Sequence, residues 1–266
     1  MTAYTDQQGR FDMLGVAQGE YTLEAEADRD RRFDPGTERV SVRRGISTFV
    51  TVYLKEKKVE SKTGGDKSVS VAMLNQKVPS AAKKEFDKAT RFFAEGDAKE
   101  SIAALRRAIA IYPDYLMARN DLGAQLLEVG ELEDAATELQ AAIKIDPKAA
   151  NPQINLGIVL ERQKKFAESL ATLDKALSLD PMSPAAHLYA GIDSVRLNDI
   201  VRGEKELKTA HELGGSSYAI ALLHLGQLYM QKGERELAIQ AFESYLQESP
   251  NAANAAQIQQ LIGKLR

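Results

Sequence analysis

The chain repeats itself with a period of 34 residues, and this repeat constrains its fold more than any other feature. Its clearest marker is a proline near the end of a unit: Pro113, Pro147 and Pro181 are 34 residues apart, and Pro250 follows 69 residues later, which is two periods plus one inserted residue. Self-similarity of this period is typical of solenoids and related repeat architectures. The register predicts five units, at residues 82–115, 116–149, 150–183, 184–218 and 219–252.

Four positions of the aligned units hold residues of nearly constant size. The eighth position is always small, as Ala89, Gly123, Gly157, Gly191 and Gly226. The twentieth is small in every unit, and the twenty-seventh is alanine in all but the last, which has Tyr245. The twenty-fourth is large, as Leu105, Leu139, Leu173, Leu207 and Phe242. Small residues let two helices approach closely, and the large residue fills the gap between neighbours. Each unit is therefore predicted to be a pair of helices.

These features resemble the tetratricopeptide repeat family, through Leu-Gly at 122–123, 156–157 and 225–226, the small residues at positions 20 and 27, and the terminal proline. The resemblance covers about two-thirds of the chain and implies an α-solenoid in which each unit buries the apolar face of its neighbour. Apolar residues at helical spacing predict a capping helix within 253–266. Because glycine lowers helix stability, Gly203 and Gly214 predict that the fourth unit is the least stable.

The first 56 residues have a different pattern. Alternating polar and apolar residues at 21–25, 40–42 and 49–54 predict short strands, and turn-forming residues separate them. So small a sheet would bury little apolar surface, which indicates that further strands precede it or that a partner supplies them. Residues 57–79, which begin with a charged stretch containing a Gly-Gly pair, are predicted to be a linker to the domain at 80–266. The fold class predicted is mainly α, with a small, incomplete β-sandwich-like domain in front.

The N-terminal part resembles the later strands of carboxypeptidase regulatory-like (transthyretin-type) β-domains, through residues 5–6, 9–11 and 19–21. An unrelated small β-element is the alternative. The resemblance implies that the complete protein has further strands before residue 1. It also implies an extracytoplasmic, for instance periplasmic, location. The first residues do not have the charged start and apolar stretch of a signal peptide, so without that truncation the chain would be cytoplasmic.

The tetratricopeptide resemblance also implies a binding groove, because in that family the first helix of each unit lines the concave face. The side chains predicted to line it are mainly aliphatic, with a few amides and two arginines: Phe86, Phe93, Asn120, Leu127, Ile154, Asn155, Ile158, Arg162, Leu188, Ile192, Val195, Arg196, Leu223, His224, Gln227 and Met230. Such a groove suits an apolar or amphipathic segment of a protein partner. The alternative is that the aliphatic members form the core between units. Phe86 and Thr90 occupy positions where the chaperone-binding version of the fold has its carboxylate-binding lysine and asparagine.

Composition excludes several other classes of function. The 35 basic and 38 acidic side chains give a net charge of −3, so there is no overall basic field for nucleic acid. There is no cysteine, the three histidines lie apart, and no nucleophile, phosphate-loop or metal-ligand motif occurs, which predicts no enzyme activity, cofactor or metal site. No apolar run is long enough for a membrane span.

The leading functional prediction is a non-catalytic scaffold that binds a peptide or amphipathic helix of a protein partner. Two alternatives remain open: a structural assembly factor of an envelope or secreted complex, attached through the β-domain, and an accessory part of a larger polypeptide. The sequence leaves the oligomeric state undecided, since open strand edges could pair with a second copy.

Overall fold

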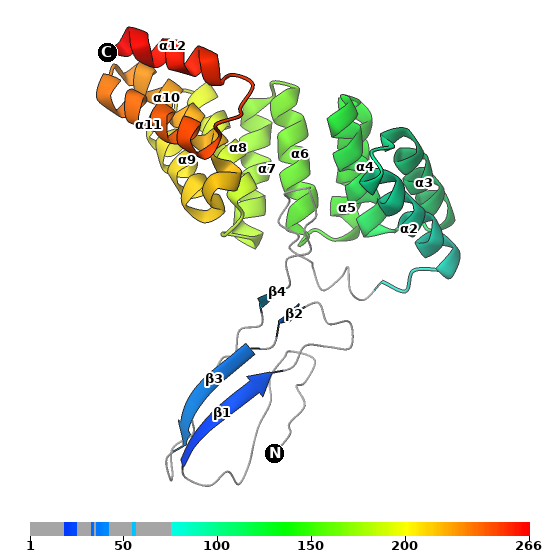
Figure 1. Cartoon of the computed structure of the whole chain (residues 1–266). Coiled ribbons are helices and arrows are strands. Elements are labelled where there is room, and N and C mark those ends of the chain that lie inside the picture. Colours follow the sequence, from blue (N-terminus) through cyan, green and yellow to red (C-terminus); the bar gives the residue numbers. More distant parts are fainter. Residues whose placement is uncertain (1–18, 26–32, 35, 43–54, 57–75) are drawn as a thin grey trace. The chain divides into compact units, whose positions relative to one another are not determined.

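The computed structural model describes residues 19–25, 33–34, 36–42, 55–56 and 76–266 (Figure 1). The chain divides into two compact units, Met1–Thr63 and Gly64–Arg266. In the first unit, strand β1 (Gly19–Ala25) pairs antiparallel with β3 (Gly36–Val42), with Gly19 opposite Val42 and Ala25 opposite Gly36.

Two shorter strands of the same unit, β2 (Phe33–Asp34) and β4 (Lys55–Glu56), also pair antiparallel. The strands predicted at 21–25 and 40–42 fall within β1 and β3, whereas the one predicted at 49–54 lies outside the described residues. The β-sandwich-like domain and its resemblance to the regulatory-like group stay predictions.

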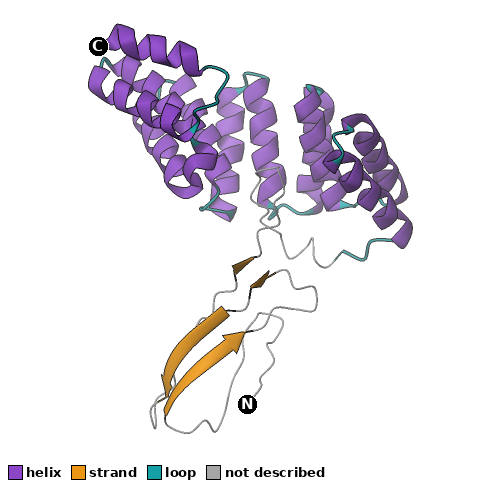
Figure 2. Ribbon diagram, in the orientation of Figure 1, coloured by secondary structure: helices purple, strands orange, loops and turns teal. Residues whose placement is uncertain are grey.

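The second unit is helical (Figure 2). Its described residues form eleven α-helices: α2 (Ser80–Ala94), α3 (Ala98–Ile111), α4 (Leu116–Val129), α5 (Leu132–Ile145), α6 (Ala150–Arg162), α7 (Phe166–Leu179), α8 (Pro184–Arg196), α9 (Ile200–Gly214), α10 (Ile220–Lys232), α11 (Arg235–Glu248) and α12 (Ala255–Leu265). A 3-10 helix, η1 (Gly215–Tyr218), follows α9. The helices stack in chain order, each contacting the next, so the predicted helical solenoid is confirmed (Figure 1).

Close approach within each helix pair depends on the small residue at the eighth position. A Cβ added to Gly123 on α4 would lie 2.5 Å from Cγ of Leu139 on α5, and one added to Gly157 on α6 would lie 2.7 Å from Cγ of Leu173 on α7. Both leucines are fully buried. The predicted fit between a small residue at position 8 and a large one at position 24 is therefore confirmed in these pairs.

A second contact at the same crossing is polar. Where position 20 is serine, its hydroxyl donates to the backbone carbonyl at position 8 of the partner helix: Ser101 Oγ to Ala89 O at 2.9 Å, and Ser169 Oγ to Gly157 O at 2.7 Å. Both serines are fully buried, so the hydrogen bond satisfies a hydroxyl that would otherwise be costly to bury.

The fourth pair uses its glycines for packing. A Cβ on Gly203 of α9 would lie 2.5 Å from Cγ2 of Val195 on α8, so this glycine brings the two helices together. Helix α9 continues through Gly214, and η1 stands where other units have the proline-containing turn. The predicted lower stability of this unit stays a prediction.

The last unit is covered by a single helix. Helix α12 packs on α11 and buries Ile258 and Ile262. Tyr245, in the column that is otherwise alanine, is buried in the same cluster, and its hydroxyl donates to Oδ1 of Asn254 at 2.8 Å. The apolar face that a sixth unit would cover is thus closed by α12. None of the helices in the described residues has the length and apolar character needed to cross a bilayer.

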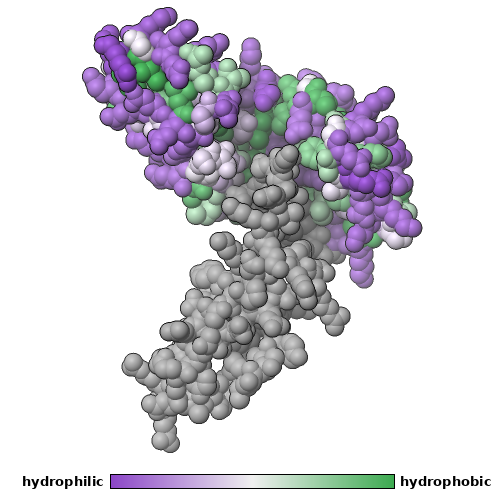
Figure 3. Space-filling model, in the orientation of Figure 1, coloured by the Kyte–Doolittle hydropathy of each residue, from purple (hydrophilic) through white to green (hydrophobic). Residues whose placement is uncertain are grey.

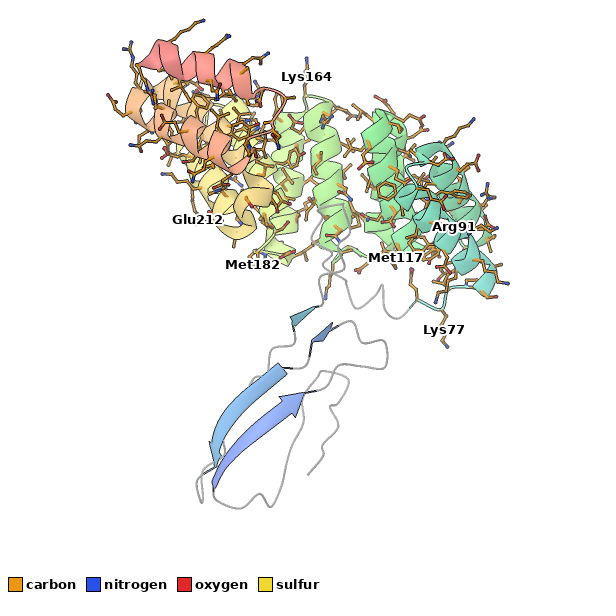
Figure 4. All side chains as sticks on the ribbon, in the orientation of Figure 1. Lys77, Arg91, Met117, Lys164, Met182 and Glu212 are labelled. Carbon is orange, nitrogen blue, oxygen red and sulfur yellow. The ribbon has the colours of Figure 1, made fainter. Side chains whose placement is uncertain are left out.

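The turn within every pair has a left-handed residue at position 15. Three units use glycine, with φ of 82° at Gly96, 84° at Gly130 and 76° at Gly233, but the third uses Lys164 (φ 61°) and the fourth Asn198 (φ 65°). The Lys164 side chain projects away from the turn between α6 and α7 (Figure 4). It is exposed.

Because a side chain strains the left-handed conformation, replacing Lys164 with glycine should stabilise the helical unit by about 0.5–1 kcal/mol. Chemical denaturation followed by circular dichroism measures the change. Lys165→Gly is the control, since Lys165 is exposed but has φ of −89°. Equal effects of the two substitutions would show that the left-handed backbone at Lys164 stores no strain.

Candidate functional site

All the side chains predicted to line the groove lie on first helices of the pairs, namely α2, α4, α6, α8 and α10. Helix α4 contacts α6, α6 contacts α8, and α8 contacts α10, whereas second helices of successive pairs have no comparable contact within 76–266. First helices therefore lie nearer to one another than second helices do, as expected of the inner side of a curved solenoid. Binding of a partner to this side stays a prediction.

Several predicted groove residues are core rather than surface. Ile154, Leu188 and Leu223 are only 6%, 6% and 7% exposed and pack within apolar clusters. Their successors one helical turn later, Ile158 and Ile192, are half-buried and pack against the same clusters. The alternative interpretation, that these aliphatic residues form the core between units, describes the three buried positions, because little of their surface is left for a partner.

The two asparagines predicted to line the groove form a hydrogen bond with each other. Asn155 Nδ2 on α6 donates to Asn120 Oδ1 on α4 at 3.0 Å, and Asn120 Nδ2 donates to Asp121 Oδ1 at 3.2 Å. Asn120 is 8% exposed. The amides thus join the first helices of two successive units through a partly buried hydrogen bond.

The aromatic residues predicted at the N-terminal end of the groove are half-buried. The Phe86 ring lies 5.1 Å from that of the buried Tyr115, centroid to centroid, and Phe86 and Leu127 pack against the core that α2 to α6 share. Tyr115 ends the loop that leads into α4, so Phe86 supports the junction between the first two units. Polar side chains dominate the visible face of the helical unit, with apolar areas among them (Figure 3).

A cavity of about 160 Å³ lies between α8 and α10, and several of the side chains predicted for the groove line it. Its lining, called the α8–α10 cavity below, consists of Ile192, Val195, Arg196, Leu207, His224, Gln227, Leu228 and Gln231. Five of these eight were predicted for the groove. Gln231 lies one helical turn after Gln227, a spacing that could have revealed it. Leu207 and Leu228 contribute from buried positions, which no surface pattern indicates.

Three further predicted residues do not line this cavity. Met230, 37% exposed, is on α10, and Arg162 is exposed at the end of α6, where its Nε lies 3.9 Å from a carboxylate oxygen of Glu161. Phe93, near the end of α2, is half-buried. The predicted set thus divides into core residues, half-buried residues and a cluster around the α8–α10 cavity.

The polar side of the cavity has one permanent charge and one titratable group. Burial lowers the pKa of His224, the nearby Arg196 guanidinium lowers it further, and a hydrogen bond with Gln227 acts in the opposite direction. The imidazole is therefore neutral at neutral pH. Arg196 is exposed, and within 76–266 no carboxylate lies within ion-pair distance of it.

One titratable group on α8 was not predicted. Asp193 is completely buried, and within the described residues neither of its carboxyl oxygens has a hydrogen-bond partner. Burial raises its pKa to about 7. Asp193 occupies the tenth position of its unit, where the two neighbouring units have the apolar residues Val159 and Leu228. The first two units have Arg91 and Gln125 at this position, so the alignment alone does not single out Asp193 as buried.

A second cavity, of about 400 Å³, lies on the other side of α10, between α9 and α11. Its lining includes Lys208, His211, Tyr229 and Leu237. Beside it, Glu204 accepts hydrogen bonds from Lys208 Nζ at 2.8 Å, Lys232 Nζ at 2.9 Å and the Tyr229 hydroxyl at 3.1 Å. The hydrogen bond from Lys208 contributes most to lowering the pKa of Glu204 to about 2. These internal pairs make the cluster a stabilising network. No group of three metal-ligating side chains occurs in the residues that the structure describes.

Comparisons with known families identify the repeat. A family model described as TPR repeat matches residues 123–164, and two models described as tetratricopeptide repeat match residues 150–181 and 190–253. A comparison with curated proteins finds no match.

Solved structures share the helical fold. PilW, described as a widely conserved type IV pilus biogenesis factor, is 22% identical with a TM-score of 0.64, over 70% of this chain and 86% of PilW. MamA from Desulfovibrio magneticus RS-1 is 18% identical with a TM-score of 0.58, over 66% of this chain and 99% of that one. YrrB, described as a TPR protein with an unusual peptide-binding site, is 16% identical with a TM-score of 0.53, over 67% and 92% of the two chains. Residues 123–181 and 190–253 thus match tetratricopeptide repeats, and the helical unit shares the solenoid fold of these structures.

Proposed function

We propose that this protein is a non-catalytic scaffold whose first helices bind a peptide or an amphipathic helix of a protein partner. The observation that carries the proposal is the α8–α10 cavity, a concave site on the side of the solenoid where the first helices meet. Four aliphatic and four polar side chains line it, and apolar surface combined with convergent polar groups is typical of sites that bind peptides. YrrB, which has this fold, is described as having a peptide-binding site.

The surface around the cavity favours an amphipathic segment. Met230 on α10 is 37% exposed and offers a flexible apolar contact, while Gln227 and Gln231 are exposed amides that can donate to and accept from a partner. The Asn120–Asn155 hydrogen bond joins the first helices of the second and third units. A rigid row of first helices reduces the ordering cost of binding.

Met230→Glu should weaken capture of the partner by roughly tenfold or more, because it places a charge on the apolar surface that the partner would bury. The measurement is affinity capture from the source organism with the full chain as bait, followed by titration of the captured partner. Val201→Glu is the matched control, since Val201 is 82% exposed on α9 and not among the cavity residues. Both variants should retain wild-type circular dichroism. Equal capture by Met230→Glu and wild type would contradict the proposal.

A second candidate is a structural assembly factor that is attached through its N-terminal unit. It is favoured by the division of the chain at Thr63 and by the fold shared with PilW, a pilus biogenesis factor. In that case an extracytoplasmic location is the one we propose. The same capture distinguishes the two candidates: removal of residues 1–63 would abolish capture, while Met230→Glu would leave it unchanged.

A further inference from the structure

We infer that the α8–α10 cavity selects an acidic, aliphatic segment of the protein partner, with an aliphatic side chain entering the cavity and a neighbouring carboxylate bound by Arg196. This inference rests on the proposed function and specifies the chemistry of the partner. It concerns the fourth and fifth units, away from Phe86 and Thr90 of the first unit, which occupy the positions of the lysine and asparagine in the carboxylate-binding version of the fold.

The cavity walls are apolar where they are deepest. Ile192 and Val195 come from α8, the fully buried Leu207 from α9 and Leu228 from α10. The volume of about 160 Å³ is of the size that one aliphatic side chain fills. An aliphatic anchor there would remove apolar surface from water on both partners.

The guanidinium of Arg196, at the edge of the cavity, forms no ion pair with the described residues. Most other arginines of the described helices are paired, for example Arg119 Nη1 at 2.5 Å from Glu138 and Arg202 with Asp174, whereas Arg235, like Arg196, has no carboxylate within ion-pair distance among the described residues. Arg196 has no such carboxylate within the described residues, and the acidic group nearest to it in sequence on α8, Asp193, is completely buried. An exposed guanidinium with free donors beside an apolar cavity fits a carboxylate geometrically and electrostatically.

A basic partner is disfavoured at the same place. Arg162 occupies the position of Arg196 one unit earlier, so a basic segment that followed the first helices would meet two like charges. Nucleic acid is also disfavoured, because the chain has a net charge of −3 and the cavity is walled by aliphatic rather than stacking aromatic side chains.

His224 couples this recognition to pH. Arg196 on α8 is the charged group within the described residues that acts on the imidazole, and Gln227 on α10 hydrogen-bonds it. The nearby charged groups of α9, Glu204 and Lys208, face Tyr229 instead. A carboxylate bound at the cavity would favour the protonated imidazole, so binding takes up a proton. Affinity for an acidic partner therefore increases as the pH falls through the range in which His224 titrates.

The test is selection of phage-displayed random peptides on the full chain and on the Arg196→Glu variant, with Arg235→Glu as the matched control. Arg235 is exposed at the start of α11 and does not line the cavity. We expect wild type and Arg235→Glu to enrich peptides in which aspartate or glutamate lies next to leucine, isoleucine or valine. The best such peptide should bind Arg196→Glu roughly tenfold to a hundredfold more weakly, as expected for losing a charged hydrogen bond. Its affinity should rise on acidification for wild type and not for His224→Gln.

The outcomes separate this inference from the proposed function. The inference would be overturned, and the proposed function would remain, if Met230→Glu abolished binding of peptides that lack acidic residues. The same holds if it abolished binding of peptides that bind Arg196→Glu as tightly as wild type. Enrichment of basic peptides would overturn it as well. If no peptide is enriched on a chain that retains its circular dichroism, both the inference and the proposed function fail.

Discussion

Replacing Asp193 with valine should stabilise the folded protein by roughly 2–4 kcal/mol at pH 8, the largest gain expected from one substitution. The physical reason is that a completely buried carboxyl group without a hydrogen-bond partner must be ionised at that pH. Valine is the residue at the same position of the third unit, where Val159 is fully buried. We therefore expect the space around residue 193, between α8 and its neighbouring helices, to accept an apolar side chain of this size.

The sign of the pH dependence follows from the direction of the shift. The pKa of Asp193 is raised from the ordinary 3.8 to about 7 in the folded protein, so the folded state holds the proton more tightly than the unfolded state. The destabilisation is absent below about pH 4, grows as the pH rises from 4 to 7 and is complete above 7. A shift of about three pKa units corresponds to an upper limit of roughly 4 kcal/mol.

Charged and polar groups around Asp193 come from three helices. The hydroxyl of Ser169 on α7 faces it but already donates to Gly157 O at 2.7 Å, Glu161 on α6 acts to raise its pKa, and Arg196 on α8 acts to lower it. The Ser169 oxygen remains available as an acceptor, so a protonated Asp193 can be accommodated there and an ionised one cannot.

The measurement is the free energy of unfolding of wild type and variant from pH 4 to 8, with the difference between the two as the readout. The difference removes contributions from other groups, such as His187, whose pKa is raised by its hydrogen bond to Glu206. Asp193→Asn is the control for charge alone and should also remove the pH dependence of the difference. A difference that stays constant over this range would show that Asp193 does not ionise in the folded protein as described.

Replacing Gly226 with alanine should destabilise the solenoid by roughly 1–3 kcal/mol. The added Cβ would lie 2.5 Å from Cδ1 of Phe242, a fully buried ring between α10 and α11 that cannot move without displacing its neighbours. The free-energy cost of overpacking at this crossing is larger than the roughly 0.5–1 kcal/mol by which alanine stabilises a helix relative to glycine.

Gly263→Ala is the matched control, because Gly263 lies within α12 and no atom would come within 4 Å of its added Cβ. It should stabilise the protein by about 0.5–1 kcal/mol through helix propensity alone. Urea unfolding followed by circular dichroism measures both. If Gly226→Ala were as stabilising as Gly263→Ala, close packing at position 8 would not be what requires glycine in this solenoid.

The repeat in the sequence determined which residues form helices and which sides of the helices meet. Gly226 and Phe242 show why: a size complementarity that recurs at a fixed spacing has one simple geometric explanation, a pair of helices packed at the same crossing in every unit. The same spacing placed every predicted groove residue on a first helix. The left-handed turn at Lys164 was not predicted, because glycine marks this position in the first, second and fifth units, whereas Lys164 and Asn198 replace it in the third and fourth.

Only the tertiary structure decided how deep each residue lies. Ile154 and Ile158 belong to the same predicted face of α6, yet one is core and the other half-buried, because depth depends on how closely successive first helices approach. The same approach joins Asn120 to Asn155, buries Asp193 and leaves a cavity between α8 and α10. A repeat fixes directions around a helix axis, since these depend on local backbone geometry. The distance between units depends on the packing of many side chains at once, and only the assembled solenoid sets it.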